Sequence, residues 1–307
     1  MDRELLTRKL VECFGEERVL LDEPMALHTT FQVGGPVDAF VSPSSVEEIE
    51  AAIEAARSAN APWHVIGKGS NLLVADRGVE GLVIHLGEPF SRIEVDGNSL
   101  SVEAGATNGE VAEAACAAGL SGYEYACGIP GSIGGAAIMN AGAYDGQFSD
   151  VCSELTCLTL SGEVVRVSRE EARWGYRKSM MADTGLVVLG ARLLLVPFDT
   201  EKIRARMEEL TRRREEKQPL ELGSAGSTFK RPVGYYAGKL IQDAGMQGHA
   251  VGGAQVSTKH AGFVVNFDHA TASDVKAVID DVREAVFADA GVTLEPEVLM
   301  WGFDDED

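Results

Sequence analysis

The stretch from Ala126 to Tyr144, ACGIPGSIGGAAIMNAGAY, combines residue types that can bind a phosphate-bearing group. Its glycines, at 128, 131, 134, 135 and 142, lack the side chain that would keep a ligand away from the backbone. Glycine also adopts positive φ, which lets successive N–H groups turn toward one anion. The stretch therefore predicts a loop lying against a large, flat, phosphate-bearing cofactor. A glycine-rich turn between buried strands is the alternative.

A second glycine turn has the sequence Gly67-Lys68-Gly69-Ser70-Asn71 and offers flexible backbone donors, a lysine charge and two side chains that can bond to phosphate oxygens. It is not the dinucleotide-binding fingerprint, because G-x-G-x-x-G requires glycine where Leu72 stands, and no Walker sequence occurs in the chain. The turn is a second candidate for holding a phosphate. An ordinary connection between two strands is the alternative.

The first two thirds of the chain alternate helical and extended patterns around these glycine segments. A period of 3.6 predicts helices at residues 1 to about 23, 46–59 and 108–118, and a short helix opened by the capping-box spacing at 168–171. Alternation predicts strands on both sides of the second glycine turn and at 82–86, 92–96, 99–104 and 186–196. Turn residues at 96–98 and 161–162 predict two hairpins.

The last third of the chain carries a different kind of sequence. It predicts helices at 199–217, 235–244 and 272–290, with strands at 250–256, 262–267 and 292–301. Helices and strands in this order indicate a small α+β domain.

Length, composition and charge limit the classes of protein to which the chain can belong. A chain of 307 residues with 45% hydrophobic content can bury the cores of about two domains. The start lacks the apolar region of a signal peptide, and no apolar run approaches the ~18 residues of a membrane span, so we expect no membrane insertion. Five cysteines without a C-x-x-C pair favour the cytoplasm. The formal charge of −21 argues against nucleic acid as a partner.

Six motifs follow one another along the chain: GKGSN, GIPGSIGGA with NAGAY, GYRKS, GSAGSTFK, STKHAGF and LEPEV. In this order and spacing, from about residue 28 to 302, the chain closely resembles the UDP-N-acetylenolpyruvoylglucosamine reductase family, flavoenzymes of peptidoglycan precursor synthesis. The resemblance implies an α+β fold, in which an FAD-binding domain of the vanillyl-alcohol-oxidase type precedes a small α+β substrate-binding domain. It indicates the shorter type of the family, because Gly245 runs promptly into the strand near Val251 without a substrate-covering insertion.

The resemblance also implies domain boundaries and cofactor contacts. We expect a helical segment at residues 1–30 that packs on the FAD domain, an FAD-binding domain of two subdomains at 31–197, and a substrate-binding domain at 198–307. FAD is expected to be bound non-covalently. The implied cofactor-binding residues are Gly67, Lys68, Gly69, Ser70, Asn71, Gly128, Ile129, Pro130, Gly131, Ser132, Gly134 and Gly135.

The implied reaction has two halves. NADPH passes hydride to FAD, and the reduced flavin passes hydride to the enolpyruvyl double bond of UDP-N-acetylglucosamine enolpyruvate, which gives UDP-N-acetylmuramate. Hydride addition leaves negative charge at the carbon beside the substrate carboxylate. That charge must be spread and a proton must be supplied. The resemblance implies Arg177, Ser227 and Glu297 as the catalytic residues.

Ser227, in GSAGSTF, matches the family's proton donor, and its spacing to the following Phe-Lys pair distinguishes it from Ser224. Arg177, in GYRKS, matches a residue that polarises the substrate carboxylate, which a planar guanidinium can bind with two hydrogen bonds. Glu297, in LEPEV, matches the third catalytic position. Strand alternation puts Glu295 on the same face, so only the resemblance selects Glu297. Whether Glu297 orients the serine proton or a water beside the enolate stays open.

Four further residues match substrate-contacting positions, namely Tyr176, Lys217, Gln247 and His260. Lys217 suits a diphosphate, because an ammonium group is a compact positive charge. The chain departs from the family pattern at two places. Arg231 stands in KRP where asparagine is more frequent, and Leu299 follows LEPEV where arginine is common.

Two other functions remain as alternatives. One is a flavin-dependent oxidase of an alcohol or hydroxy acid on the same scaffold, and the other is a non-catalytic protein that binds a nucleotide sugar. The motifs GSAGSTFK and LEPEV favour the reductase over the oxidase. No metal is expected, because ligand clusters of recognisable spacing are absent from the sequence, and no protein partner is expected.

Overall fold

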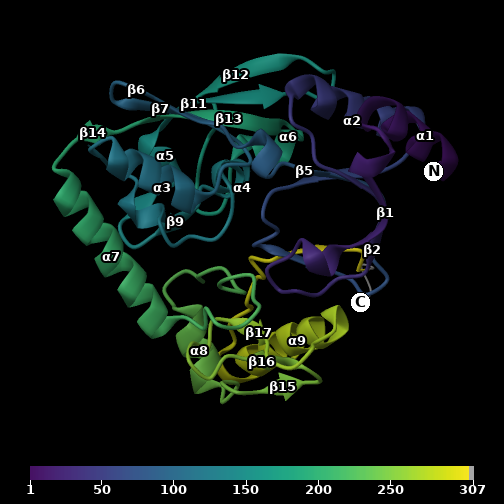
Figure 1. The fold of residues 1–307 in the computed structure, drawn as a ribbon. Coiled ribbons are helices and arrows are strands. Elements are labelled where there is room, and N and C mark those ends of the chain that lie inside the picture. Colours follow the sequence, from purple (N-terminus) through teal and green to yellow (C-terminus); the bar gives the residue numbers. More distant parts are fainter. Residues whose placement is uncertain (304–307) are drawn as a thin grey trace. The chain divides into compact units, whose positions relative to one another are not determined.

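The computed structural model describes residues 1–303, which fall into two compact units (Figure 1). Unit 1 comprises residues 1–20, 40–68 and 82–214. Unit 2 comprises residues 21–39 and 69–81 together with residues 215–303. The chain therefore passes repeatedly from one unit to the other, and each unit is assembled from segments that are distant in sequence.

Unit 1 is built around a five-stranded antiparallel sheet with the strand order β12-β11-β13-β7-β6. The strands span Ile93–Asp96 (β6), Ser99–Glu103 (β7), Cys152–Leu158 (β11), Val164–Ser168 (β12) and Val187–Leu194 (β13). Both predicted hairpins are confirmed, because Asp96 pairs with Ser99 and Leu158 pairs with Val164. Two-residue strand pairs add to the unit, joining Leu120–Ser121 (β8) to Val196–Pro197 (β14) and Gly142–Ala143 (β9) to Gly146–Gln147 (β10).

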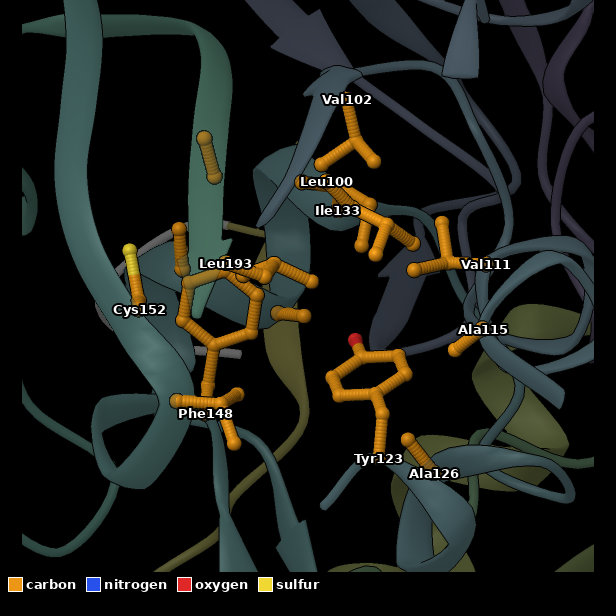
Figure 2. Packing of buried hydrophobic residues seen from close by; sticks show 14 of the residues in the cluster. Leu100, Val102, Val111, Ala115, Tyr123, Ala126, Ile133, Phe148, Cys152 and Leu193 are labelled. Carbon is orange, nitrogen blue, oxygen red and sulfur yellow. The ribbon is translucent and has the colours of Figure 1, made fainter. Parts of the chain in front are cut away.

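Helices of unit 1 share one hydrophobic core with this sheet (Figure 2). They span Asn108–Ala117 (α3), Ile133–Met139 (α4), Phe148–Val151 (α5), Met180–Thr184 (α6) and Thr200–Lys217 (α7), whose last three residues belong to unit 2. Tyr123 is 1% exposed, and its hydroxyl donates to Asn108 Oδ1 at 2.7 Å, which satisfies the polar end of a core side chain. This core also contains three buried cysteines, namely Cys116, Cys152 and Cys157.

A second sheet has the strand order β1-β2-β5-β3. Its strands span Val19–Pro24 (β1), Pro36–Val41 (β2), Trp63–Ile66 (β3) and Val79–His85 (β5). Helix α1 (Arg3–Phe14) packs on α2 (Val46–Ser58). The bounds of α2 confirm the helix predicted at 46–59. The prediction of one helix to about residue 23 is wrong. Gly15, with φ of 80°, ends α1, a short 3-10 turn follows at Glu16–Arg18, and residues from Val19 are held as a strand in the sheet.

The helix predicted to open at Ser168 is only a turn. The predicted cap is present, because the Glu171 N–H donates to Ser168 Oγ at 3.3 Å and the Ser168 N–H donates to the Glu171 carboxylate at 2.9 Å. Arg173 then adopts φ of 46°, which lies outside the right-handed helical region. The chain therefore leaves the helical path after a single turn.

Unit 2 contains a three-stranded antiparallel sheet, β15-β16-β17, whose core is shared with α8 and α9 (Figure 1). These elements span Ala237–Asp243 (α8), Ala250–Val251 (β15), Ala254–Val256 (β16), Val264–Asn266 (β17) and Ala272–Ala290 (α9). The helix at 272–290 is confirmed. The strand predicted at 250–256 is instead two strands that pair with each other.

The last strand of unit 2 is shorter than predicted. Strand β18 spans Leu299–Trp301 and pairs in parallel with β4 (Leu72–Val74), so the prediction of a strand over 292–301 is wrong for its first part. Ahead of β18, Pro296 makes an isolated bridge to Phe229. The chain just before β18 therefore makes a single bridge to the loop that carries Phe229 and is not a strand of a sheet.

Two kinds of feature are not found among residues 1–303. No helix there combines the length and apolar character that crossing a membrane requires. Nor do three or more His, Cys, Asp or Glu side chains in this part of the chain gather where they could hold a metal ion. All five cysteines carry free thiols.

Candidate active site

The glycine-rich stretch forms a loop followed by α4 in unit 1. The N–H groups of Ile133 and Gly134 donate to main-chain carbonyls just before and after Gly105, each at 2.9 Å, and these bonds fix the start of the helix. Gly135 is exposed, and a β-carbon at this position would have no heavy atom of the protein within 4 Å. One face of α4 is therefore bare backbone that a ligand can approach.

The second glycine turn is shaped by contacts within the protein. A β-carbon on Gly67 would lie 1.9 Å from Ser132 Oγ, so this glycine brings the turn against the loop that precedes α4. Gly69 has φ of 58°, and a β-carbon there would lie 2.0 Å from the carbonyl oxygen of His28. Packing between chain segments thus accounts for part of the glycine content here, as the alternative of an ordinary turn supposes.

The main chains beside Ser227 and Glu297 lie side by side in unit 2. The Glu297 N–H donates to the Thr228 carbonyl at 2.8 Å, and the buried Thr228 hydroxyl accepts from the Val264 N–H at 2.9 Å. Ser227 is exposed and Glu297 is half-buried. The two predicted catalytic residues of this unit are therefore neighbours on a fixed backbone.

Glu295 and Glu297 differ in their surroundings, although alternation could not separate them. The carboxylate of Glu295 is 69% exposed and forms an ion pair with Lys230, whose N–H also donates to the Glu295 carbonyl at 2.9 Å. The main chain of Glu297 is bound on its other side by Asn71, whose Nδ2 donates to the Glu297 carbonyl at 3.0 Å. The end of the second glycine turn is thus joined to Glu297.

Arg177 lies in a tight turn of unit 1. Gly175 and Lys178 exchange main-chain hydrogen bonds of 3.0 and 3.4 Å across the turn, and Arg177 adopts φ of 55°. The guanidinium of Arg177 lies over the ring of Tyr176, 5.2 Å from its centroid. A left-handed conformation costs an arginine roughly 1–2 kcal/mol, which the contacts that hold this turn must offset.

The remaining predicted substrate residues lie in unit 2. Gln247 Nε2 donates to the Thr258 carbonyl at 2.8 Å, which fixes this side chain on the segment that carries His260. Burial lowers the pKa of His260, and its Nδ1 accepts from the Gly262 N–H at 3.0 Å, so the neutral imidazole is favoured. Lys217 ends α7. The Arg231 guanidinium, at the first departure from the family pattern, lies 3.9 Å from the centroid of the Tyr236 ring.

Lys259 is a basic residue near this group that was not predicted. Its Nζ donates to the Glu215 carbonyl at 2.7 Å, two residues before Lys217. It also lies 3.8 Å from the Glu221 carboxylate. Its place in the STKHAGF motif was a signal for it, but only the fold shows that its ammonium reaches the end of α7.

Arg214 is a further residue that sequence reasoning missed. It lies on α7, and its Nη1 would be 3.3 Å from a β-carbon on Gly128, at the start of the glycine-rich loop. Burial lowers its pKa, yet a guanidinium stays protonated in proteins, so a positive charge lies behind the loop. The signal was its spacing, because Ile203, Met207, Leu210 and Arg214 share one helical face.

Two family models match the chain. One is described as an FAD binding domain and matches residues 37–168. The other is described as the C-terminal domain of UDP-N-acetylenolpyruvoylglucosamine reductase and matches residues 218–301. The first match includes both glycine segments, and the second includes Ser227 and Glu297.

Relatives with this description resemble the chain over nearly its whole length. The UDP-N-acetylenolpyruvoylglucosamine reductase of Clostridium beijerinckii is 50% identical, and the alignment covers 95% of each chain. That of Pediococcus pentosaceus is 48% identical over 97% of this chain and 99% of the relative. Among solved structures, UDP-N-acetylenolpyruvylglucosamine reductase from Thermus caldophilus aligns with a TM-score of 0.80 and 36% identity, covering 92% of this chain and 98% of that one.

Proposed function

The chain belongs to the UDP-N-acetylenolpyruvoylglucosamine reductase family, and from this premise we propose how its own residues carry out the family's reaction. It reduces the enolpyruvyl group of UDP-N-acetylglucosamine enolpyruvate to give UDP-N-acetylmuramate in peptidoglycan precursor synthesis, with FAD as cofactor and NADPH as hydride donor. The observation that supports the residue assignment is the main-chain hydrogen bond between Thr228 and Glu297, which places the backbone of Ser227 next to that of Glu297.

The two glycine segments and Arg214 fit an FAD site. Bare backbone at Gly135 allows a flat ring system to approach, and the buried guanidinium of Arg214 supplies a positive charge behind Gly128 for an electron-rich group. The predicted contacts at residues 67–71, 128–132, 134 and 135 are proposed to hold the cofactor. When bound, FAD accepts hydride from NADPH and delivers it to the substrate double bond.

The Ser227 hydroxyl is proposed to give the proton that completes the reduction. A serine is a weak acid, but hydride addition makes the carbon beside the substrate carboxylate part of an enolate-like group, which is a strong base and accepts the proton. Glu297 is proposed to orient the transferred proton, either on the serine hydroxyl or on a water beside the enolate. Its half-buried position and doubly bound main chain support such an orienting role.

Arg177 is proposed to bind the substrate carboxylate, which accumulates negative charge as the enolate forms. A guanidinium makes two parallel bonds to a carboxylate and stabilises the developing charge. Tyr176, Lys217, Gln247 and His260 are proposed to bind the nucleotide sugar. We assign FAD binding to residues 31–197, substrate binding to 198–307 and a packing role to 1–30. Free thiols at all five cysteines support a reducing compartment, the cytoplasm.

Anaerobic mixing separates this function from the two alternatives. The purified yellow protein, absorbing near ~450 nm, should bleach when NADPH is added and regain its colour when the enolpyruvyl sugar nucleotide follows. An oxidase of an alcohol or hydroxy acid would be bleached by that substrate and would not be reoxidised by the enolpyruvyl compound. A non-catalytic binding protein would retain the sugar nucleotide but would not oxidise NADPH.

Gly135→Ala tests the proposed cofactor face. Because a β-carbon at this position meets no protein atom, the variant without FAD should be as stable as the parent or up to about 1 kcal/mol more stable. A ring system lying on the helix would meet the new methyl group, so FAD affinity should fall by about tenfold or more. Thermal unfolding of FAD-free protein and titration with FAD measure the two effects.

Gly109→Ala is the matched control for this test. Gly109 also lies in a helix, α3, and a β-carbon there would make only an ordinary contact, 3.5 Å from the Cys127 carbonyl oxygen. Its FAD affinity should match that of the parent. Equal FAD affinity in Gly135→Ala and Gly109→Ala would place the cofactor elsewhere than on this face of α4.

A further inference from the structure

Asn140 is a buried polar residue that has no role in the reaction proposed above. It follows α4 directly, is 3% exposed and adopts φ of 43°. Asparagine tolerates this left-handed conformation better than most residues, so the backbone alone accounts for its type at a helix end. The backbone does not account for its side-chain contacts.

Three hydrogen bonds engage the amide of Asn140. Its Oδ1 accepts from the Ser149 N–H at 2.9 Å. Its Nδ2 donates to Gln147 Oε1 and to the Gly175 carbonyl, each at 3.2 Å. The amide thus uses both of its donor directions, and one of them leads to the turn that carries Arg177.

The bond to Gly175 reaches the residue that closes this turn. Gly175 and Lys178 hold the two ends of the turn, and Arg177 lies between them in a left-handed conformation. A second bond from the same helix supports it, because Trp174 Nε1 donates to the Ala137 carbonyl at 2.7 Å. The turn is therefore attached to the end of α4, while the bare glycine face lies at the beginning of the same helix.

We propose that Asn140 is a positioning residue for Arg177, holding the Arg177 turn in register with the glycine helix α4. This inference rests on the proposed role of Arg177 at the substrate carboxylate. A turn that contains a left-handed arginine relaxes easily once its anchor is lost, and a small misplacement of a charge-stabilising group slows a reaction strongly. Asn140 itself touches no reacting atom in this proposal.

Asn140→Asp is the sharpest variant. The carboxylate keeps an oxygen for the Ser149 N–H but removes the donor to Gly175 and faces its carbonyl oxygen with negative charge. We expect flavin reoxidation by the enolpyruvyl substrate to slow by about tenfold or more, whereas reduction by NADPH changes by less than about twofold. Rapid-mixing absorbance measurements on the holoenzyme give both rates.

Two controls and one second variant accompany it. Asn60→Asp alters an exposed asparagine that also follows a helix and has φ of 49°, and it should change neither rate. Gln147→Ala removes the other acceptor of Nδ2 and should leave the bond to Gly175 and both rates intact. If Asn140→Asp does not fold, Trp174→Phe loosens the same turn through its other bond and should slow reoxidation selectively.

A double-mutant cycle with Arg177→Gly decides whether Asn140 acts through Arg177. If it does, Asn140→Asp should slow reoxidation by less than about twofold when Arg177 is already absent. Full additivity, or equal slowing of both half-reactions by Asn140→Asp alone, would overturn the inference and leave the role of Arg177 intact. Normal reoxidation in Arg177→Gly alone would instead remove the proposed role of Arg177, and the inference with it.

Discussion

Ser227→Ala is expected to retain FAD and to be reduced by NADPH at the parental rate, but to be reoxidised by the enolpyruvyl substrate at least ~10²-fold more slowly. The substitution removes the hydroxyl that is proposed to supply the proton and leaves hydride delivery to the flavin untouched. Because Ser227 is exposed and its neighbour Thr228 carries the structural bonds, the fold should tolerate the change. Anaerobic rapid mixing of the reduced variant with substrate measures the rate.

Ser224→Ala is the matched control for this experiment. Ser224 lies in the same loop, where its N–H donates to the Thr30 carbonyl and its carbonyl accepts from the Thr30 hydroxyl, so its side chain can be removed without breaking these bonds. It should turn over like the parent. The assignment of the proton donor would fail if Ser227→Ala reoxidised as fast as Ser224→Ala.

Arg177→Gly is expected to slow reoxidation by ~10²–10³-fold without loss of stability. Glycine adopts φ of 55° without the penalty that arginine pays, although it also gains freedom in the unfolded chain. The free energy of unfolding should therefore stay within about 1 kcal/mol of the parent value. Denaturant unfolding and the rate of flavin reoxidation provide the two measurements.

Arg173→Gly separates the effect of relieving a left-handed backbone conformation from the effect of removing the Arg177 charge. Arg173 is exposed and also left-handed, with φ of 46°, only four residues earlier in the chain. The same strain is relieved there, but no substrate contact is proposed, so turnover should be unchanged. A similar loss of turnover in both variants would mean that the turn's conformation, rather than the Arg177 charge, is what the reaction needs.

Helices could be predicted where their beginning and end signals are local. Helix α9 runs over 272–290 as expected, because Thr271 caps its first turn and Gly291 ends it with φ of 65°. The predicted N-terminal helix is too long, because residues Val19–Pro24 become a strand through pairing within their sheet, which adjacent residues do not encode. The cap at Ser168 formed without a helix because Arg173 turns the chain away.

Some residues of the candidate site could also be predicted from local sequence motifs, whereas others depend on contacts that only the fold shows. Ser227 and Glu297 could be proposed because each lies in a contiguous motif, and their nearness follows from a pairing of loops that no periodicity shows. Arg214 was missed because it stands in a run of charged residues, where one buried arginine looks like its exposed neighbours. The structure does require glycine at Gly69, but the nearby His28 carbonyl explains this requirement as well as a bound cofactor would.

The repeated passage of the chain between its two units limits how such an enzyme can be rearranged. The core of unit 2 includes Phe31, Val33 and Leu73 from the N-terminal quarter, and β18 pairs with β4 from the same quarter. A gene fragment that encodes only the C-terminal third would lack these side chains and leave apolar surface open to water. Recombination therefore cannot exchange this third between proteins as a self-sufficient cassette, and chimeras must carry the early segments along with it.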